Sequence, residues 1–171
     1  MPIIFANSVA EVFFWIFLSL FIASAVARLV LRDKKWSLYT ASCPLFCLGL
    51  AFVCLTPYHP LIYISCFIMA LGDFLRAKEG TLWLILAAVM IVGAQIINLA
   101  VLVFAILVAN VILYCEIVIL VGYVLYAASE LLFDRLGRLL KMKNRTFYVL
   151  ALYYLGQLCI YLGLVLSLAN L

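Results

Sequence analysis

The chain has 171 residues, of which 71% are hydrophobic and 11% charged, and its formal net charge is +4. Soluble domains average about 45–50% apolar and about 25% charged residues, so this composition excludes an ordinary water-soluble globule. The basic residues form three short clusters between apolar stretches, which is the pattern of an integral membrane protein and not of a nucleic-acid-binding arm.

Continuous apolar runs such as Val9–Val26 and Leu82–Ile97 favour helices over barrel strands. Lipid offers no hydrogen bonds to the backbone, so only helices and closed barrels cross a bilayer. Barrel strands alternate apolar and polar residues over about ten positions, unlike these runs. The sequence therefore predicts an all-α fold, a polytopic transmembrane helix bundle that forms one domain over residues 1–171.

The first half of the chain predicts three helices. They cover about Ile3–Val30, Leu38–Leu55 and Leu61–Leu75, and two prolines mark the turn before the third. Basic residues follow the first and the third of these helices. The two basic clusters consist of Arg28, Arg32, Lys34 and Lys35, and of Arg76 and Lys78.

The second half of the chain predicts three more helices. If the basic loops on both sides of the apolar stretch Thr81–Phe133 share one side of the membrane, the stretch must cross an even number of times. Two helices fit, about Thr81–Val103 and Ala109–Phe133, with their turn near Phe104–Asn110. A last helix runs from about Thr146 to Leu168, which makes about six spans.

The basic clusters also predict the orientation of this multi-pass protein. The positive-inside rule places all three basic loops in the cytosol. The segment Met1–Asn7 carries no positive charge, and the apolar run after it is too long for a signal peptide. We therefore expect a retained first helix with a non-cytosolic N-terminus. The third cluster consists of Arg135, Arg138, Lys141, Lys143 and Arg145.

Asp73 and Glu130 are the candidate catalytic residues, because each lies near the cytosolic end of a predicted span. Ionisable groups inside spans are costly and usually functional. Two carboxyl groups at one depth suit general acid–base chemistry, in which one donates a proton and the other accepts one. The simpler alternative is an ion pair between Asp73 and Arg76 at i, i+3.

Tyrosine and glutamine side chains near the same depth are the candidate substrate-binding residues. Their hydroxyl and amide groups can orient a water or a lipid headgroup, although tyrosines also anchor helices at membrane interfaces. These candidates are Tyr126, Tyr153, Tyr154 and Gln157.

Glu11, Gln95 and Glu116 form a second polar set nearer the other face. Hydrogen bonding between helices explains this set most simply, and a transport path is the alternative. The lone His59 and the six cysteines form no metal-ligand pattern, so we expect no metal and no cofactor.

Three segments resemble the YhhN family of integral membrane lysoplasmalogenases. Met69–Leu75 is similar to the family's Leu-Gly-Asp segment, Gly122–Glu130 to its Gly-Ala-x-x-Phe-x-x-Ser-Asp segment, and Tyr153–Gln157 to its Tyr-Tyr-x-x-Gln segment. They occur in the same order, and the likeness touches most of the chain from about residue 40.

The chain departs from the family's pattern at four points. Glu130 stands where the family has aspartate, and Cys43-Pro44 stands in place of a Lys-Pro segment. Gln95 follows Gly93 and Ala94 in a helix where the family usually shows histidine. Finally, the chain has room for about six spans, and the family has about eight.

The resemblance implies hydrolysis of the vinyl-ether bond of a lysoplasmalogen, a lysophospholipid, to a fatty aldehyde and a glycerophospho-headgroup. This reaction needs an acid to protonate carbon and a base to activate water, roles that suit Asp73 and Glu130. Two alternatives remain: a catalytically inactive lipid-binding or accessory subunit of a membrane complex, or a small transporter.

Overall fold

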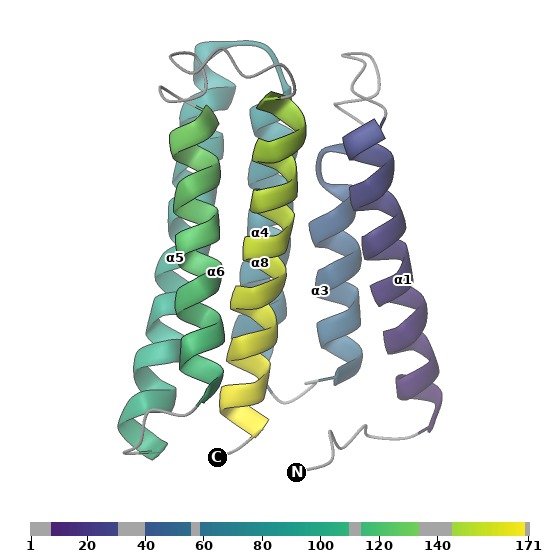
Figure 1. Ribbon diagram of the computed structural model, residues 1–171, viewed down its shortest axis with the longest axis vertical. Coiled ribbons are helices and arrows are strands. Elements are labelled where there is room, and N and C mark those ends of the chain that lie inside the picture. The colour runs from purple at the N-terminus through teal and green to yellow at the C-terminus, as the bar shows by residue number, and fades with distance from the viewer. Residues whose placement is uncertain (1–7, 31–39, 56–58, 110–113, 134–144, 170–171) are drawn as a thin grey trace. The chain divides into compact units, whose positions relative to one another are not determined.

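The computed structural model describes residues 8–30, 40–55, 59–109, 114–133 and 145–169, and the regular elements in these ranges are all helices (Figure 1). This confirms the predicted all-α fold. The chain divides into two compact units, Met1–Val108 and Ala109–Leu171. The helices are α1 Ser8–Val30, α3 Cys43–Leu55, α4 Pro60–Ala77, α5 Thr81–Ala109, α6 Tyr114–Leu131 and α8 Arg145–Ala169.

Four of these helices, α1, α4, α5 and α8, are long and apolar enough to cross a membrane. The structure is therefore consistent with an integral membrane protein of several spans. Helix α3 has 13 residues. At about 1.5 Å per residue it is roughly 20 Å long, shorter than the hydrocarbon core of about 30 Å. The number of six crossings stays a prediction.

Of the helix expected over Leu38–Leu55, Leu38 and Tyr39 lie outside the described residues, and α3 begins at Cys43. Pro44 has no backbone N–H, so a helix running through it from Leu38 would lose an interior hydrogen bond, whereas the first turn tolerates proline. The amide of Phe46 donates to the carbonyl of Ser42 over 2.9 Å and closes this first turn. Proline thus sets the start of α3.

The turn predicted near Phe104–Asn110 is wrong in position, because α5 stays helical to Ala109. Val103–Ala109 contains only apolar residues and neither glycine nor proline, so no local signal ends the helix there. Helix α5 therefore has 29 residues, and α6 covers Tyr114–Leu131 instead of Ala109–Phe133.

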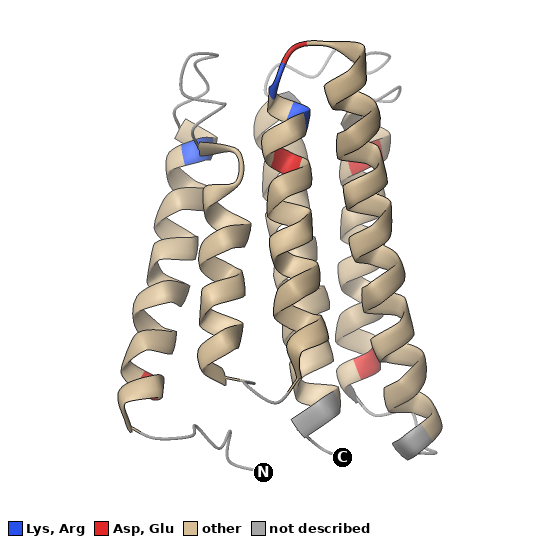
Figure 2. Cartoon of the chain, turned by 180° about the vertical axis from the view of Figure 1, so that it is seen from behind, with Lys and Arg blue, Asp and Glu red and all other residues tan. Residues whose placement is uncertain are grey.

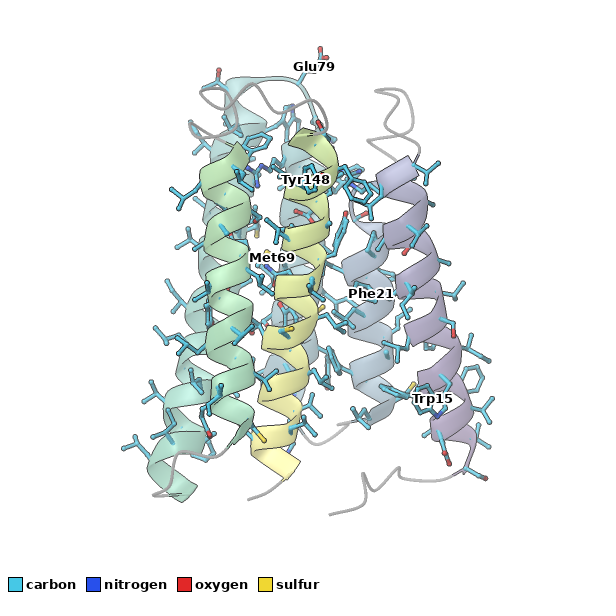
Figure 3. The ribbon with its side chains drawn as sticks, in the orientation of Figure 1. Trp15, Phe21, Met69, Glu79 and Tyr148 are labelled. Atoms are coloured by element: carbon cyan, nitrogen blue, oxygen red, sulfur yellow. The ribbon has the colours of Figure 1, made fainter. Side chains whose placement is uncertain are left out.

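In the first unit, α1 packs on α3 and α3 packs on α4. The ring of Phe21 is buried on the side of α1 that faces α3 (Figure 3). The thiol of Cys66 on α4 donates to the carbonyl of Leu45 on α3 over 3.1 Å. Gly72 brings α4 close to α5, since a Cβ atom there would lie 2.7 Å from Cγ1 of Ile91. Contacts between helices that follow one another along the chain therefore stabilise this unit.

The described basic residues of the first unit gather at one end (Figure 2). Arg28, near the end of α1, donates from Nη1 to Oγ1 of Thr40 over 3.3 Å. In the α4–α5 turn, the Nζ atom of Lys78 lies 4.9 Å from the ring centre of Phe74 and 4.3 Å from that of Trp83. These contacts hold both positive charges beside the helix ends. Of the first basic cluster, Arg32, Lys34 and Lys35 lie outside the described residues.

The second unit is an antiparallel pair of α6 and α8 in which glycines allow a close approach. A Cβ atom on Gly122 would lie 2.8 Å from the carbonyl oxygen of Gly156, and one on Gly156 would lie 2.9 Å from that of Gly122. A Cβ atom on Gly163 would collide with the side chain of Ile119. Small residues let backbones of membrane helices touch in this way. Of the third basic cluster, Arg135, Arg138, Lys141 and Lys143 lie outside the described residues.

Candidate functional site

The second unit holds five of the six predicted site residues, two on α6 and three on α8. The rings of Tyr126 on α6 and Tyr153 on α8 have centres 5.9 Å apart. The ring centre of Tyr154 lies 5.2 Å from that of Tyr153. Because the two helices are antiparallel, Glu130, one turn after Tyr126, and Gln157, one turn after Tyr153, lie on opposite sides of this ring contact. Aromatic contact thus links the two helices at the candidate site.

Gln157 is the most unusual of these residues. Its side chain is fully buried, at 0% exposure. Neither its Nε2 nor its Oε1 atom has a hydrogen-bond partner among the described residues. A buried amide that is left unpaired costs about 1–3 kcal/mol, so a polar ligand group beside it would recover binding energy.

Glu130 lies in the last turn of α6 and is half-buried. Ser129, beside it, is buried and donates from Oγ to the carbonyl of Tyr126 over 2.6 Å. That bond ties the serine to its own helix, so Ser129 is a structural neighbour of the acid.

Asp73 belongs to the first unit, near the end of α4 that also carries Arg76. Its side chain is buried, with 8% of its surface exposed. Gly72, which precedes it, faces α5, and Met69, one turn earlier, is fully buried. Asp73 therefore lies on an inward part of α4, close to the basic end of its unit. The shared pocket expected for Asp73 and Glu130 stays a prediction. The alternative, an ion pair between Asp73 and Arg76, stays a prediction as well.

The second polar set includes one helix-to-helix contact. Glu116 of α6 is buried, and the hydroxyl of Ser167 on α8 donates to its Oε1 over 3.4 Å. This contact favours hydrogen bonding between helices over a transport path for Glu116. Glu11 is exposed in the first turn of α1.

The sequence interpretation missed a buried polar pair, Ser65 on α4 and Asn98 on α5. Both side chains are fully buried, and Oγ of Ser65 lies 2.6 Å from Oδ1 of Asn98. The available signal was a polar residue inside each apolar run. The sequence separation of 33 residues hid their contact.

No group of three or more histidine, cysteine or acidic side chains in the described part of the chain is arranged to hold a metal ion. The chain matches no protein-family model, no curated protein and no solved structure. The resemblance to the YhhN family therefore stays a prediction from three sequence segments.

Proposed function

We propose that the chain is a membrane-embedded hydrolase that cleaves the vinyl-ether bond of lysoplasmalogens, with Asp73 and Glu130 as its acid and base. One observation carries this proposal. The Gln157 amide is buried and has no hydrogen-bond partner among the described residues. It lies one turn from Tyr153, whose ring contacts Tyr126 on α6, the helix that also holds Glu130. A lipid headgroup or a water beside this amide would satisfy its donors and its acceptor.

The reaction matches two carboxyl groups. One protonates the vinyl carbon that does not carry the ether oxygen, which leaves an oxocarbenium ion. The other removes a proton from the water whose oxygen adds to the charged carbon. The hemiacetal then breaks its bond to the glycerol oxygen and releases a fatty aldehyde and a free hydroxyl group. The tyrosine hydroxyls and the Gln157 amide orient the water or the headgroup.

We place the basic loops on the cytosolic side, so that the substrate enters from the inner leaflet. Arg28 and Lys78 at one end of the first unit support this orientation, since cytosolic ends carry an excess of positive charge. The same charges attract the anionic phosphate of a lysophospholipid. Asp73 lies near this basic end, as a residue that acts on a bond next to the headgroup should.

Aldehyde release from lysoplasmalogen by the purified protein in lipid nanodiscs tests the proposal. Because general acid–base groups contribute about 10²–10⁴-fold, Asp73→Asn and Glu130→Gln should each lower the rate by at least about 100-fold. Glu11→Gln is the matched control, since Glu11 is an exposed carboxylate outside the site. An alkyl-ether analogue should not be cleaved. Undiminished release in both site variants would overturn the assignment of acid and base.

A second candidate function is a non-catalytic lipid-binding or accessory subunit. The observation that favours it is sequence-based: Gln95 and Cys43 stand where the resembling family has histidine and lysine. This candidate predicts that the chain purifies in a fixed ratio with another membrane protein and releases no aldehyde. Turnover by the isolated chain would exclude it.

A further inference from the structure

A polar cluster lies beside the contact of α4 with α5 in the first unit, away from the residues of the proposed function. Ser65 on α4 and Asn98 on α5 are fully buried. The Oγ atom of Ser65 lies 2.6 Å from Oδ1 of Asn98 and 2.8 Å from the carbonyl oxygen of Ile62. Gln95 precedes Asn98 by one turn of α5, and both polar atoms of its side chain are buried.

This cluster has more hydrogen-bonding groups than the described residues satisfy. The Ser65 hydroxyl has one proton, for either the Ile62 carbonyl or the Asn98 amide. The Nδ2 atom of Asn98 has no partner within the described ranges. Rotating that amide by half a turn would pair Nδ2 with Ser65 and leave Oδ1 unsatisfied instead. In the same ranges, neither Nε2 nor Oε1 of Gln95 has a partner. Unsatisfied donors and acceptors therefore occur on two successive turns of α5.

The depth of the cluster restricts what satisfies it. Asn98 lies nine residues from Leu107, the nearer end of its candidate span, which is about 13 Å at 1.5 Å per residue. Lipid supplies no hydrogen bonds at that depth. A metal cation would satisfy only the amide oxygens and an anion only the N–H groups, whichever way the amides are turned. The missing group is thus small, neutral and able both to donate and to accept.

Water meets all these requirements, and a buried water typically makes about three hydrogen bonds to polar groups that would otherwise be unsatisfied. We propose that Ser65, Gln95 and Asn98 bind an internal water molecule beside the α4–α5 contact. The water connects the amides of two successive turns of α5 with the hydroxyl of α4. It makes this part of the first unit a hydrated point within an apolar helix pair.

Water-edited solid-state NMR of the isotope-labelled full chain in lipid bilayers tests the proposal, because magnetisation that starts on water reaches only protein sites close to a water. The side-chain amides of Gln95 and Asn98 should gain this magnetisation several-fold faster than the side chain of Leu99. Leu99 is the internal control, since it lies next to Asn98 and is exposed on the apolar surface of α5. Amides as slow as Leu99 would overturn the proposal.

A variant tests whether Ser65, Gln95 and Asn98 bind the same water molecule. Asn98→Leu removes one of the groups that hold the water, so the transfer to Gln95 should be lost. Leu99→Ala changes the neighbouring exposed side chain and should leave the transfer to Gln95 unchanged. Persistent transfer to Gln95 in Asn98→Leu would refute a site made by all three residues. If a variant does not fold, the wild-type measurement still decides whether the amides are hydrated.

Discussion

Replacing Gly156 by alanine tests how closely α6 and α8 pack. The new Cβ atom would lie 2.9 Å from the carbonyl oxygen of Gly122 and 2.9 Å from the backbone nitrogen of Tyr126. Both are backbone atoms, so they cannot rotate away as a side chain can. Restoring an ordinary contact of 3.4 Å requires the helices to separate by about 0.5 Å, and such a gap already forfeits a quarter of the dispersion energy at the contact.

Two opposing terms set the size of the effect. Overpacking of this kind costs about 1–3 kcal/mol. Alanine in place of glycine recovers about 0.8–1.0 kcal/mol of helix propensity. The cost of overpacking exceeds the gain in helix propensity, so Gly156→Ala should lower the free energy of unfolding by up to about 2 kcal/mol. Reversible unfolding in mixed detergent micelles, followed by far-UV circular dichroism, measures this difference.

Gly93→Ala is the matched control, because it makes the same chemical change in a helix without a clash. A Cβ atom on Gly93 would meet nothing within 4 Å. This variant should gain up to about 1 kcal/mol from helix propensity alone. Equal stability of Gly156→Ala and Gly93→Ala would refute the close approach of α6 and α8.

Two further predictions concern a turn and an aromatic contact. Gly80 has a φ of 125°, which other residues rarely adopt, so Gly80→Ala should lower the free energy of unfolding by about 1–3 kcal/mol. The cost comes from the backbone, because the new Cβ atom would meet only Cδ1 of Trp83, at an ordinary 3.4 Å. If Gly80→Ala is no less stable than Gly93→Ala, this φ is not required. The ring pair of Tyr126 and Tyr153 should give a coupling energy of about 0.5–1.5 kcal/mol in a double-mutant cycle with leucine at both positions. Strictly additive single variants would contradict that contact.

Hydropathy predicted a helix well where proline or charged residues end the apolar run. Proline before Leu61 and basic residues after Leu75 bracket the run that became α4, which the structure extends only to Pro60–Ala77. The boundary between α5 and α6 was missed because Val103–Ala109 contains no glycine, proline or charge. A turn without local signals is decided by packing, which hydropathy does not register.

Spacing along one helix predicted part of the candidate site. Tyr126 and Glu130 are separated by four residues, as are Tyr153 and Gln157, so each pair shares a helix face. The contact of Ser65 with Asn98 depends instead on how α4 and α5 are aligned. That alignment follows from the Gly72 approach and the length of the turn, which a pattern within one helix does not contain.

The length of α5 has a consequence for the surrounding bilayer. Its candidate span, Thr81–Leu107, has 27 residues and is about 40 Å long at 1.5 Å per residue. A hydrocarbon core of about 30 Å accommodates it only if the helix tilts by about 40° or the lipids stretch to meet it. Helix α4, with 18 residues and a length of about 27 Å, fits nearly upright. In a membrane that α4 crosses upright, α5 therefore fits only by tilting away from α4 or by local thickening of the bilayer beside it.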